Sequence, residues 1–322
     1  MIKRTSTVLA VAAIGVIAVP VWGQTSYPNR AIRMVAPFAP GGASDFIARM
    51  LAPKLSERLG QTVVVDNRSG AGGNIGFEIV ARAPPDGYTL MIASSSYATN
   101  AAVTPKLSFD PIKDVRPISL VGVSPLVLVV HPSVSARSIG ELVALAKAQP
   151  GRLKFGSSGT GASPHLAGEL FKATAGIDLL HIPYKGSGPA LIDTLSGQIE
   201  MTFISMLVVR SHINAGRLRL LGVGTPQRAR ALPDVPGIAE TLPGFESTSW
   251  YTVMGPARLP ATLVARWNRE VNALVKTPEI ADRLANDTVE PKDLSPEATA
   301  KYVADEITRW KAVAQRAGVR LD

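Results

Sequence analysis

The 322-residue sequence contains no cysteine. This absence excludes disulfide bonds, thiolate metal ligands, a cysteine nucleophile and a lipid-modified N-terminal cysteine. Because no disulfide cross-link can form, the fold must be stabilised by a packed core. A chain of this length, rich in valine, leucine, isoleucine and alanine, is long enough for two domains of ordinary size.

Long runs of charge are also missing. The formal net charge is +9, which loss of Lys3 and Arg4 with an N-terminal signal would lower by two to +7. A nucleic-acid surface needs a clustered basic stripe with interleaved aromatic side chains, but the basic residues are dispersed and only 6% of residues are aromatic. We therefore expect no nucleic-acid partner, and the positive charge weakly favours small anionic partners.

The one long apolar stretch lies near the N-terminus, over residues 8–19, after a basic start and before small residues. This layout is typical of a secretory signal peptide. The stretch is well short of the roughly 20 residues that span a bilayer. We predict a signal over residues 1–23 and a mature periplasmic protein that begins at Gln24.

Short apolar runs of strand type alternate with helical patterns along the chain. The strand-type runs cover residues 32–36, 62–65, 89–93, 126–130, 153–155 and 179–183. The expected helix N-caps are Ser44, Ser138, Ser163 and Ser295. This alternation favours an α/β fold.

Four glycine-rich loops precede helical patterns. They are A-P-G-G-A at 39–43, S-G-A-G-G-N at 69–74, G-S-S-G-T-G-A at 156–162 and Y-K-G-S-G at 184–188. The first turn of a helix carries unpaired N–H groups and a partial positive charge, and glycine leaves that backbone open to a ligand. One such loop would be an ordinary connection. Two pairs, in separate thirds of the chain, predict a small-anion site between two lobes.

No catalytic or cofactor motif is complete. Thr160 stands where a nucleophile elbow needs its second glycine. Ile75 stands where the dinucleotide fingerprint needs its last one, and there is no Walker loop. The four histidines are too far apart in sequence to suggest a metal site. We expect no cofactor, no metal and no enzymatic activity, while a periplasmic hydrolase that uses a loop serine stays open as an alternative.

Several longer motifs follow one another in a fixed order. They are Y-P-N-R-A-I-R-M-V-A-P-F-A-P-G-G-A-S-D at 27–45, P-P-D-G-Y-T-L at 84–90, G-S-S-G-T-G-A-S-P-H-L-A-G-E-L-F at 156–171, I-P-Y-K-G-S-G-P-A at 182–190 and R-W-K-A-V-A-Q-R-A-G-V at 309–319. In this order they resemble the Bug (TctC-like) family, extracytoplasmic solute receptors associated with tripartite tricarboxylate transporters. The resemblance covers nearly the whole mature chain.

The resemblance implies a periplasmic binding protein of type II, with two α/β lobes joined by a two-segment hinge. The lobes are expected at residues 24–122 with 251–322, and at 123–250. A monomer of this kind closes over a small carboxylate or related polar molecule and delivers it to the membrane components of the transporter. A solute sensor that signals to a membrane partner is not separated from a transport receptor by the sequence.

In that family the glycine loops of both lobes hold the ligand, largely through backbone groups. The ligand-binding residues expected from it are Phe38, Ala39, Gly41, Gly42, Asp45, Ser94, Ser157, Gly159, Gly161, Ala162, Ser163 and Asp193. Asp45 could instead cap its own helix, and Asp193 could be a solvated or structural carboxylate. The sequence departs from the family pattern near Ser94, where Ala101 replaces a frequent proline, so the ligand itself is not predicted.

Overall fold

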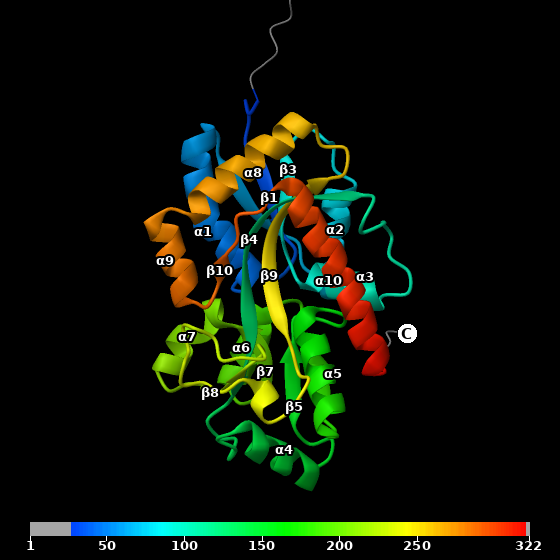
Figure 1. The fold of residues 1–322 in the computed structure, drawn as a ribbon, viewed down its shortest axis with the longest axis vertical. Helices are drawn as coiled ribbons and strands as arrows, with labels where there is room; N and C mark the ends of the chain where they lie inside the picture. The colour runs from blue at the N-terminus through cyan, green and yellow to red at the C-terminus, as the bar shows by residue number, and fades with distance from the viewer. Residues whose placement is uncertain (1–26, 320–322) are drawn as a thin grey trace, which may run out of the picture.

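Two long strands, β4 (Val115–Val130) and β9 (Thr248–Pro256), run side by side through the middle of the molecule (Figure 1). In the computed structural model, which describes residues 27–319, β4 pairs antiparallel with β9 as far as Pro125 and Thr248. Beyond this point β4 pairs with two strands of a second lobe. The chain therefore passes between two lobes along these strands. The predicted signal, residues 1–23, lies outside the described residues.

The first lobe is built on a sheet with the strand order β2-β1-β3-β9-β4. Its other strands are β1 (Ile32–Ala36), β2 (Val63–Asn67), β3 (Thr89–Ser94) and β10 (Glu290–Pro291). Its helices are α1 (Ala43–Leu59), η1 (Ala71–Gly73), α2 (Asn74–Ala81), α3 (Ser96–Val103), α8 (Ala261–Val275), α9 (Pro278–Asn286) and α10 (Pro296–Arg316). The strands β1, β2 and β3 are parallel, and β9 runs antiparallel to β3.

Helices cover both faces of this sheet (Figure 1). Because side chains alternate along a strand, Ile32 and Met34 of β1 pack in the core with α1 and α8, whereas Val35 packs in the core with α2, α3 and α10. Trp267 of α8 and Trp310 of α10 are fully buried in these cores. Both tryptophans were predicted as core residues from their helical spacing, and this is confirmed.

The second lobe continues the sheet in the order β4-β7-β5-β6, with β8 also paired to β4. Its strands are β5 (Lys154–Ser157), β6 (Leu180–Pro183), β7 (Met201–Ser205) and β8 (Arg219–Val223). Its helices are α4 (Ile139–Ala148), α5 (Ser163–Ala175), α6 (Ser187–Leu195), α7 (Met206–Asn214) and η2 (Ile238–Glu240). The α/β class predicted from the sequence is confirmed. Within residues 27–319, no helix combines the length and the apolar character needed to cross a membrane.

The helices that begin at glycine loops lack the predicted serine caps. Side-chain caps are present at Ser138 and Ser295. The prediction was wrong for Ser44, because α1 already begins after Gly42, and for Ser163, because α5 begins after Ala162. Gly42 and Ala162 thus form these N-caps without a side-chain hydrogen bond. The side chains of Ser44 and Ser163 instead line the cavity between the lobes.

Tyr27 holds the start of the described chain against the first lobe. The buried indole Nε1 of Trp267 donates to the Tyr27 hydroxyl over 2.7 Å, and this hydroxyl donates to the Gly87 carbonyl oxygen, also over 2.7 Å. Burial raises the pKa of Tyr27 to about 12. The hydroxyl therefore stays protonated and links two otherwise distant segments.

Replacing Tyr27 with phenylalanine should lower the free energy of unfolding by about 2 kcal/mol, because the fully buried Trp267 N–H loses its acceptor. Urea denaturation followed by tryptophan fluorescence measures this change. The matched control is Tyr302→Phe, at a half-buried tyrosine whose ring packs edge-on against Trp250. If the two variants had the same midpoint, the hydrogen-bond argument would be wrong.

A serine-lined cavity between the lobes

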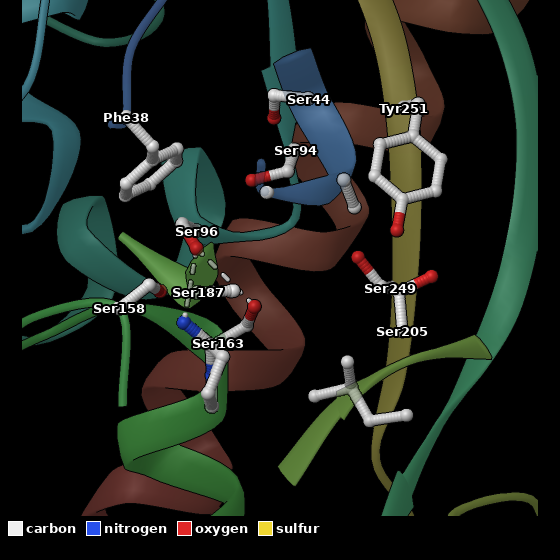
Figure 2. A pocket seen from close by; sticks show the side chains of 14 residues that line it. Phe38, Ser44, Ser94, Ser96, Ser158, Ser163, Ser187, Ser205, Ser249 and Tyr251 are labelled. Carbon is white, nitrogen blue, oxygen red and sulfur yellow. Dashed lines mark hydrogen bonds between the residues drawn. The ribbon is translucent and has the colours of Figure 1, made fainter. Parts of the chain in front are cut away.

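A small cavity lies where the two lobes meet. Its volume is about 30 Å³, enough for a water molecule or two. The lining residues come from both lobes and from the crossing strands: Phe38, Gly42, Ala43, Ser44, Ser94, Ser96, Leu126, Ser158, Ser163, Pro164, Ser187, Ser205, Ser249 and Tyr251. Figure 2 shows their hydroxyl groups gathered around the shared space. Serine is thus the main polar residue of the site.

Five helices begin at this cavity. The first residues of α1, α3, α5 and α6 line it, and so does Ser205, the N-cap of α7. Helix N-termini carry partial positive charge and N–H groups without intrahelical partners. Two of these termini face each other across the lobes, since a Cβ built on Gly42 would lie 3.7 Å from the backbone nitrogen of Ser187. The cavity is therefore suited to an anion.

The lining described above contains no charged side chain. Asp45 belongs to the first turn of α1, but it does not line the cavity. It accepts hydrogen bonds from the Gly41 N–H, Arg49 and Asn67. Burial alone would raise the pKa of Asp45, but these hydrogen bonds lower it below the usual value. The positive potential in the cavity thus comes from backbone dipoles rather than from lysine or arginine.

Backbone groups of the glycine loops bind the lobes to each other. The Ala39 N–H donates to the Lys185 carbonyl oxygen over 3.0 Å. The Ser163 N–H donates to the Ser96 hydroxyl over 3.1 Å, and the two serine hydroxyls lie 3.2 Å apart. Ser96 belongs to the first lobe and Ser163 to the second. The structure is therefore a closed form in which each lobe supplies hydrogen-bond partners to the other.

Glycine permits this close approach. A Cβ built on Gly188 would lie 2.4 Å from the Pro40 carbonyl oxygen, and one built on Gly72 would lie 2.4 Å from the Thr160 carbonyl oxygen. Both contacts join the two lobes, and real Cβ atoms do not approach backbone oxygens so closely. Several glycines of the predicted anion loops therefore serve lobe closure.

Two stacked histidines support the second glycine loop. The rings of His165 and His181 are 4.0 Å apart between centroids. His165 Nδ1 accepts from the Gly161 N–H over 3.2 Å, and His181 Nε2 lies 2.7 Å from the Ser157 hydroxyl oxygen. Burial lowers the pKa of His165 to about 4 and that of His181 to about 3, with smaller contributions from Lys172 and, for His181, from the neighbouring His165. Both rings are therefore neutral at pH 7.

The pair of Ser157 and His181 has the short distance of a nucleophile and its base. The Ser157 side chain, however, is only 1% exposed and does not line the cavity. No group of three or more histidine, aspartate or glutamate side chains within residues 27–319 could hold a metal ion. Ser157 and His181 thus stabilise the glycine loop at residues 156–162, since the Ser157 hydroxyl also accepts a hydrogen bond from the Gly159 N–H.

The residues predicted from the sequence divide into three groups. Those that line the cavity are Phe38, Gly42, Ser94 and Ser163. Those in the surrounding loops, at the end of β5 (Ser157) or in a first helical turn, outside the lining, are Ala39, Gly41, Asp45, Ser157, Gly159, Gly161 and Ala162. Asp193 lies apart on α6, where its carboxylate accepts a hydrogen bond of 2.7 Å from Tyr184; burial, and next this carboxylate, raise the pKa of that tyrosine. A ligand role for these twelve residues stays a prediction.

Sequence reasoning missed one side of the cavity, formed by Ser205, Ser249 and Tyr251. Ser205 ends β7 and begins α7 without a glycine loop. Ser249 and Tyr251 lie two residues apart on β9, so they share one face of that strand. The alternation S-x-Y on a crossing strand was the only available signal.

Two α/β lobes that close over a hydroxyl-lined cavity define the class of two-lobed solute-binding proteins. The model of the tripartite tricarboxylate transporter family receptor, TctC, matches residues 47–319. The chain therefore belongs to the TctC family of periplasmic solute-binding receptors, and the resemblance and the fold class inferred from the sequence are confirmed. The family consists of receptors and not of enzymes, so the hydrolase alternative is set aside.

Individual relatives agree with this assignment. Protein BugT of Bordetella pertussis is 39% identical over 308 residues, which cover 95% of this chain and 94% of BugT. Among solved structures, R. palustris Rpa4515 with adipate is 37% identical, covers 91% of this chain and 98% of its own, and superposes with a TM-score of 0.87. MatC from Rhodopseudomonas palustris with bound malate is 28% identical, with coverage of 89% and 99% and a TM-score of 0.85.

Proposed function

We propose that this protein captures a small carboxylate in the cavity between its lobes and delivers it to the membrane components of a tripartite tricarboxylate transporter. The observation that carries the proposal is the convergence of five helix N-termini on a cavity with no charged side chain in its lining. The adipate in Rpa4515 and the malate in MatC support the same ligand class.

The balance of free energies favours this type of ligand. Taking a carboxylate out of water costs several kcal/mol, and each hydrogen bond to a charged group returns about 1.5 to 3 kcal/mol. Three or four donors therefore suffice, and the first-turn N–H groups of α1 and α6 with the hydroxyls of Ser94, Ser96 and Ser163 supply them. Site roles are accordingly proposed for the loops at residues 38–45, 94–96 and 157–163.

Capture requires that the lobes separate, because backbone contacts between the two lobes close the cavity in this structure. We assign the first lobe to residues 24–122 with 251–322 and the second to residues 123–250, with β4 and β9 as the hinge. The strands cross between the lobes where β4 exchanges β9 for β7 as its partner, near Leu126. Export by the signal over residues 1–23 belongs to the same proposal.

Calorimetric titration tests the function directly. Protein stripped by unfolding and refolding is titrated with mono-, di- and tricarboxylates, including adipate and malate, and with the methyl ester of every acid that binds. We expect at least one acid to bind with a Kd of about 1 μM or below, and its ester to bind at least tenfold more weakly. If no acid bound, or if the esters bound equally well, an anion site would be ruled out.

A further inference from the structure

Tyr251 and Ser205 form a second polar group in the cavity, away from the glycine loops. Tyr251 is 1% exposed and Ser205 is 4% exposed. Both hydroxyls line the cavity, and neither makes a hydrogen bond of normal geometry within the described residues, although Ser205 is close enough to influence the pKa of Tyr251. Buried hydroxyls are nearly always paired, so these two point to a group that the ligand brings.

The location of these hydroxyls separates them from the proposed carboxylate site. Figure 2 shows the Tyr251 hydroxyl directed towards Ser205 and Ser249, while Ser96, Ser158 and Ser163 lie on the other side of the cavity in this view. Tyr251 belongs to the hinge strand β9 and Ser205 to the end of β7. A ligand held at the glycine loops would therefore meet them with its far end.

The chemistry of this far side favours an uncharged partner. Burial raises the pKa of Tyr251, and the nearby hydroxyls of Ser205 and Ser249 offset only part of that effect. Tyr251 is thus neutral, and each hydroxyl can both donate and accept a hydrogen bond. No lysine, arginine or histidine stands in the lining to balance a second charge.

We infer that the ligand is a carboxylate whose other end carries an uncharged hydrogen-bonding group, such as a carboxamide or a hydroxyl, bound by Tyr251 and Ser205. This inference rests on the proposed function and specifies the ligand class of the same site. An amide satisfies the donor and the acceptor capacity of both hydroxyls, whereas a carboxylate can only accept. An apolar end would leave both hydroxyls unpaired.

Three acids of equal size and shape test the inference by calorimetry: succinamate, succinate and 4-methylpentanoate. Their far ends are an amide, a carboxylate and an isopropyl group. We expect succinamate to bind at least tenfold more tightly than either of the others. A second series, in which each acid is longer by one CH2 group, consists of glutaramate, glutarate and 5-methylhexanoate. Equal affinity for the isopropyl acid would overturn the polar subsite, and tightest binding of the diacid would overturn its uncharged class.

The variant Tyr251→Phe separates the subsite from the carboxylate site. Its affinity for the half-amide should fall about tenfold, while its affinity for the branched acid stays unchanged. Tyr302→Phe, outside the cavity lining, should bind all acids as the wild type does. An equal loss for both acids would mean that Tyr251 acts only on the fold. If the wild type bound no acid, the proposed function would fail, whereas equal binding of all three acids would remove the subsite alone.

Discussion

Replacement of Gly188 with alanine should weaken binding of the best carboxylate at least a hundredfold, although it adds only one methyl group. The new Cβ would lie 2.4 Å from the Pro40 carbonyl oxygen of the opposite lobe. A backbone oxygen in a packed loop cannot move aside as a flexible side chain can. The lobes would therefore stop short of the closed form, and the donors of α1 and α6 would not reach one ligand together.

The second lobe itself should tolerate the change. Gly188 is the second residue of α6, and alanine is the better helix former by roughly 0.5–1 kcal/mol. Gly140→Ala is the matched control, because Gly140 is likewise the second residue of α4 and its added Cβ would meet only the Ser138 hydroxyl at 4.0 Å. Calorimetry measures the affinity, and small-angle scattering should show a larger radius of gyration for Gly188→Ala. Unchanged affinity would mean that the contact with Pro40 is not part of the bound form.

The sequence predicted that glycine loops matter, but not which glycine meets which atom. Gly41 stood out because it precedes a helix, yet a Cβ there would lie 3.8 Å from the Gly188 Cα, an ordinary contact. Its φ of +81° would be the obstacle to substitution. One of the two tightest interlobe approaches belongs to Gly188, whose partner Pro40 is far away in the chain. Contacts of this kind depend on how two lobes dock, which local patterns do not encode.

Secondary structure was predictable where a run of apolar residues was bounded by polar or glycine residues. β1 at Ile32–Ala36 was predicted with its correct ends, and β3 at Thr89–Ser94 to within one residue. The strand-type run at residues 126–130 is only the end of β4, whose earlier part carries two prolines and small polar residues and is a strand through its pairing with β9. β7 was missed, since it passes into α7 without a turn.

The part of the candidate site at the glycine loops was also predictable, because these loops have a local sequence pattern. Phe38, Gly42 and Ser163 lie in or beside glycine loops that local reasoning can recognise, and they line the cavity. Tyr251 lies on a strand whose residues are almost all buried, and the S-x-Y alternation does not show that its hydroxyl borders a cavity. Its role became visible only when the hydroxyl was found buried without a partner.

Acidification from pH 7 to pH 4 should lower the free energy of unfolding through the stacked histidines. A histidine in the unfolded chain has a pKa near 6.5, whereas burial lowers the pKa of His165 to about 4 in the folded protein. Between these values the unfolded state binds more protons, so stability falls as the pH drops. The difference corresponds to about 3 kcal/mol for His165. His181 adds to the effect, although the two stacked rings titrate as a coupled pair.

The groups around the stack set the direction of the change. Lys172 lies on the same helix as His165 and lowers its pKa further, while Glu169 is 3.9 Å from His165 Nε2 and too far for a hydrogen bond. A proton on His165 Nδ1 would also break the hydrogen bond that this atom accepts from the Gly161 N–H. Acid therefore loosens the second glycine loop together with the lobe that carries it.

His165→Asn isolates this contribution, because the asparagine oxygen can replace Nδ1 as an acceptor and does not titrate. The free energy of unfolding is measured by urea denaturation at pH 7, 6, 5 and 4. At pH 7 the variant should be less stable than the wild type, because it has lost the ring stack. On acidification to pH 4 its free energy of unfolding should fall by about 3 kcal/mol less than that of the wild type. The control variant His131→Asn, in the turn after β4, should show the same change in the free energy of unfolding with pH as the wild type. Parallel curves for His165→Asn and the wild type would show that the buried ring is not the acid-sensitive group, and the carboxylates with lowered pKa values, such as Asp45 and Asp66, would then account for the loss.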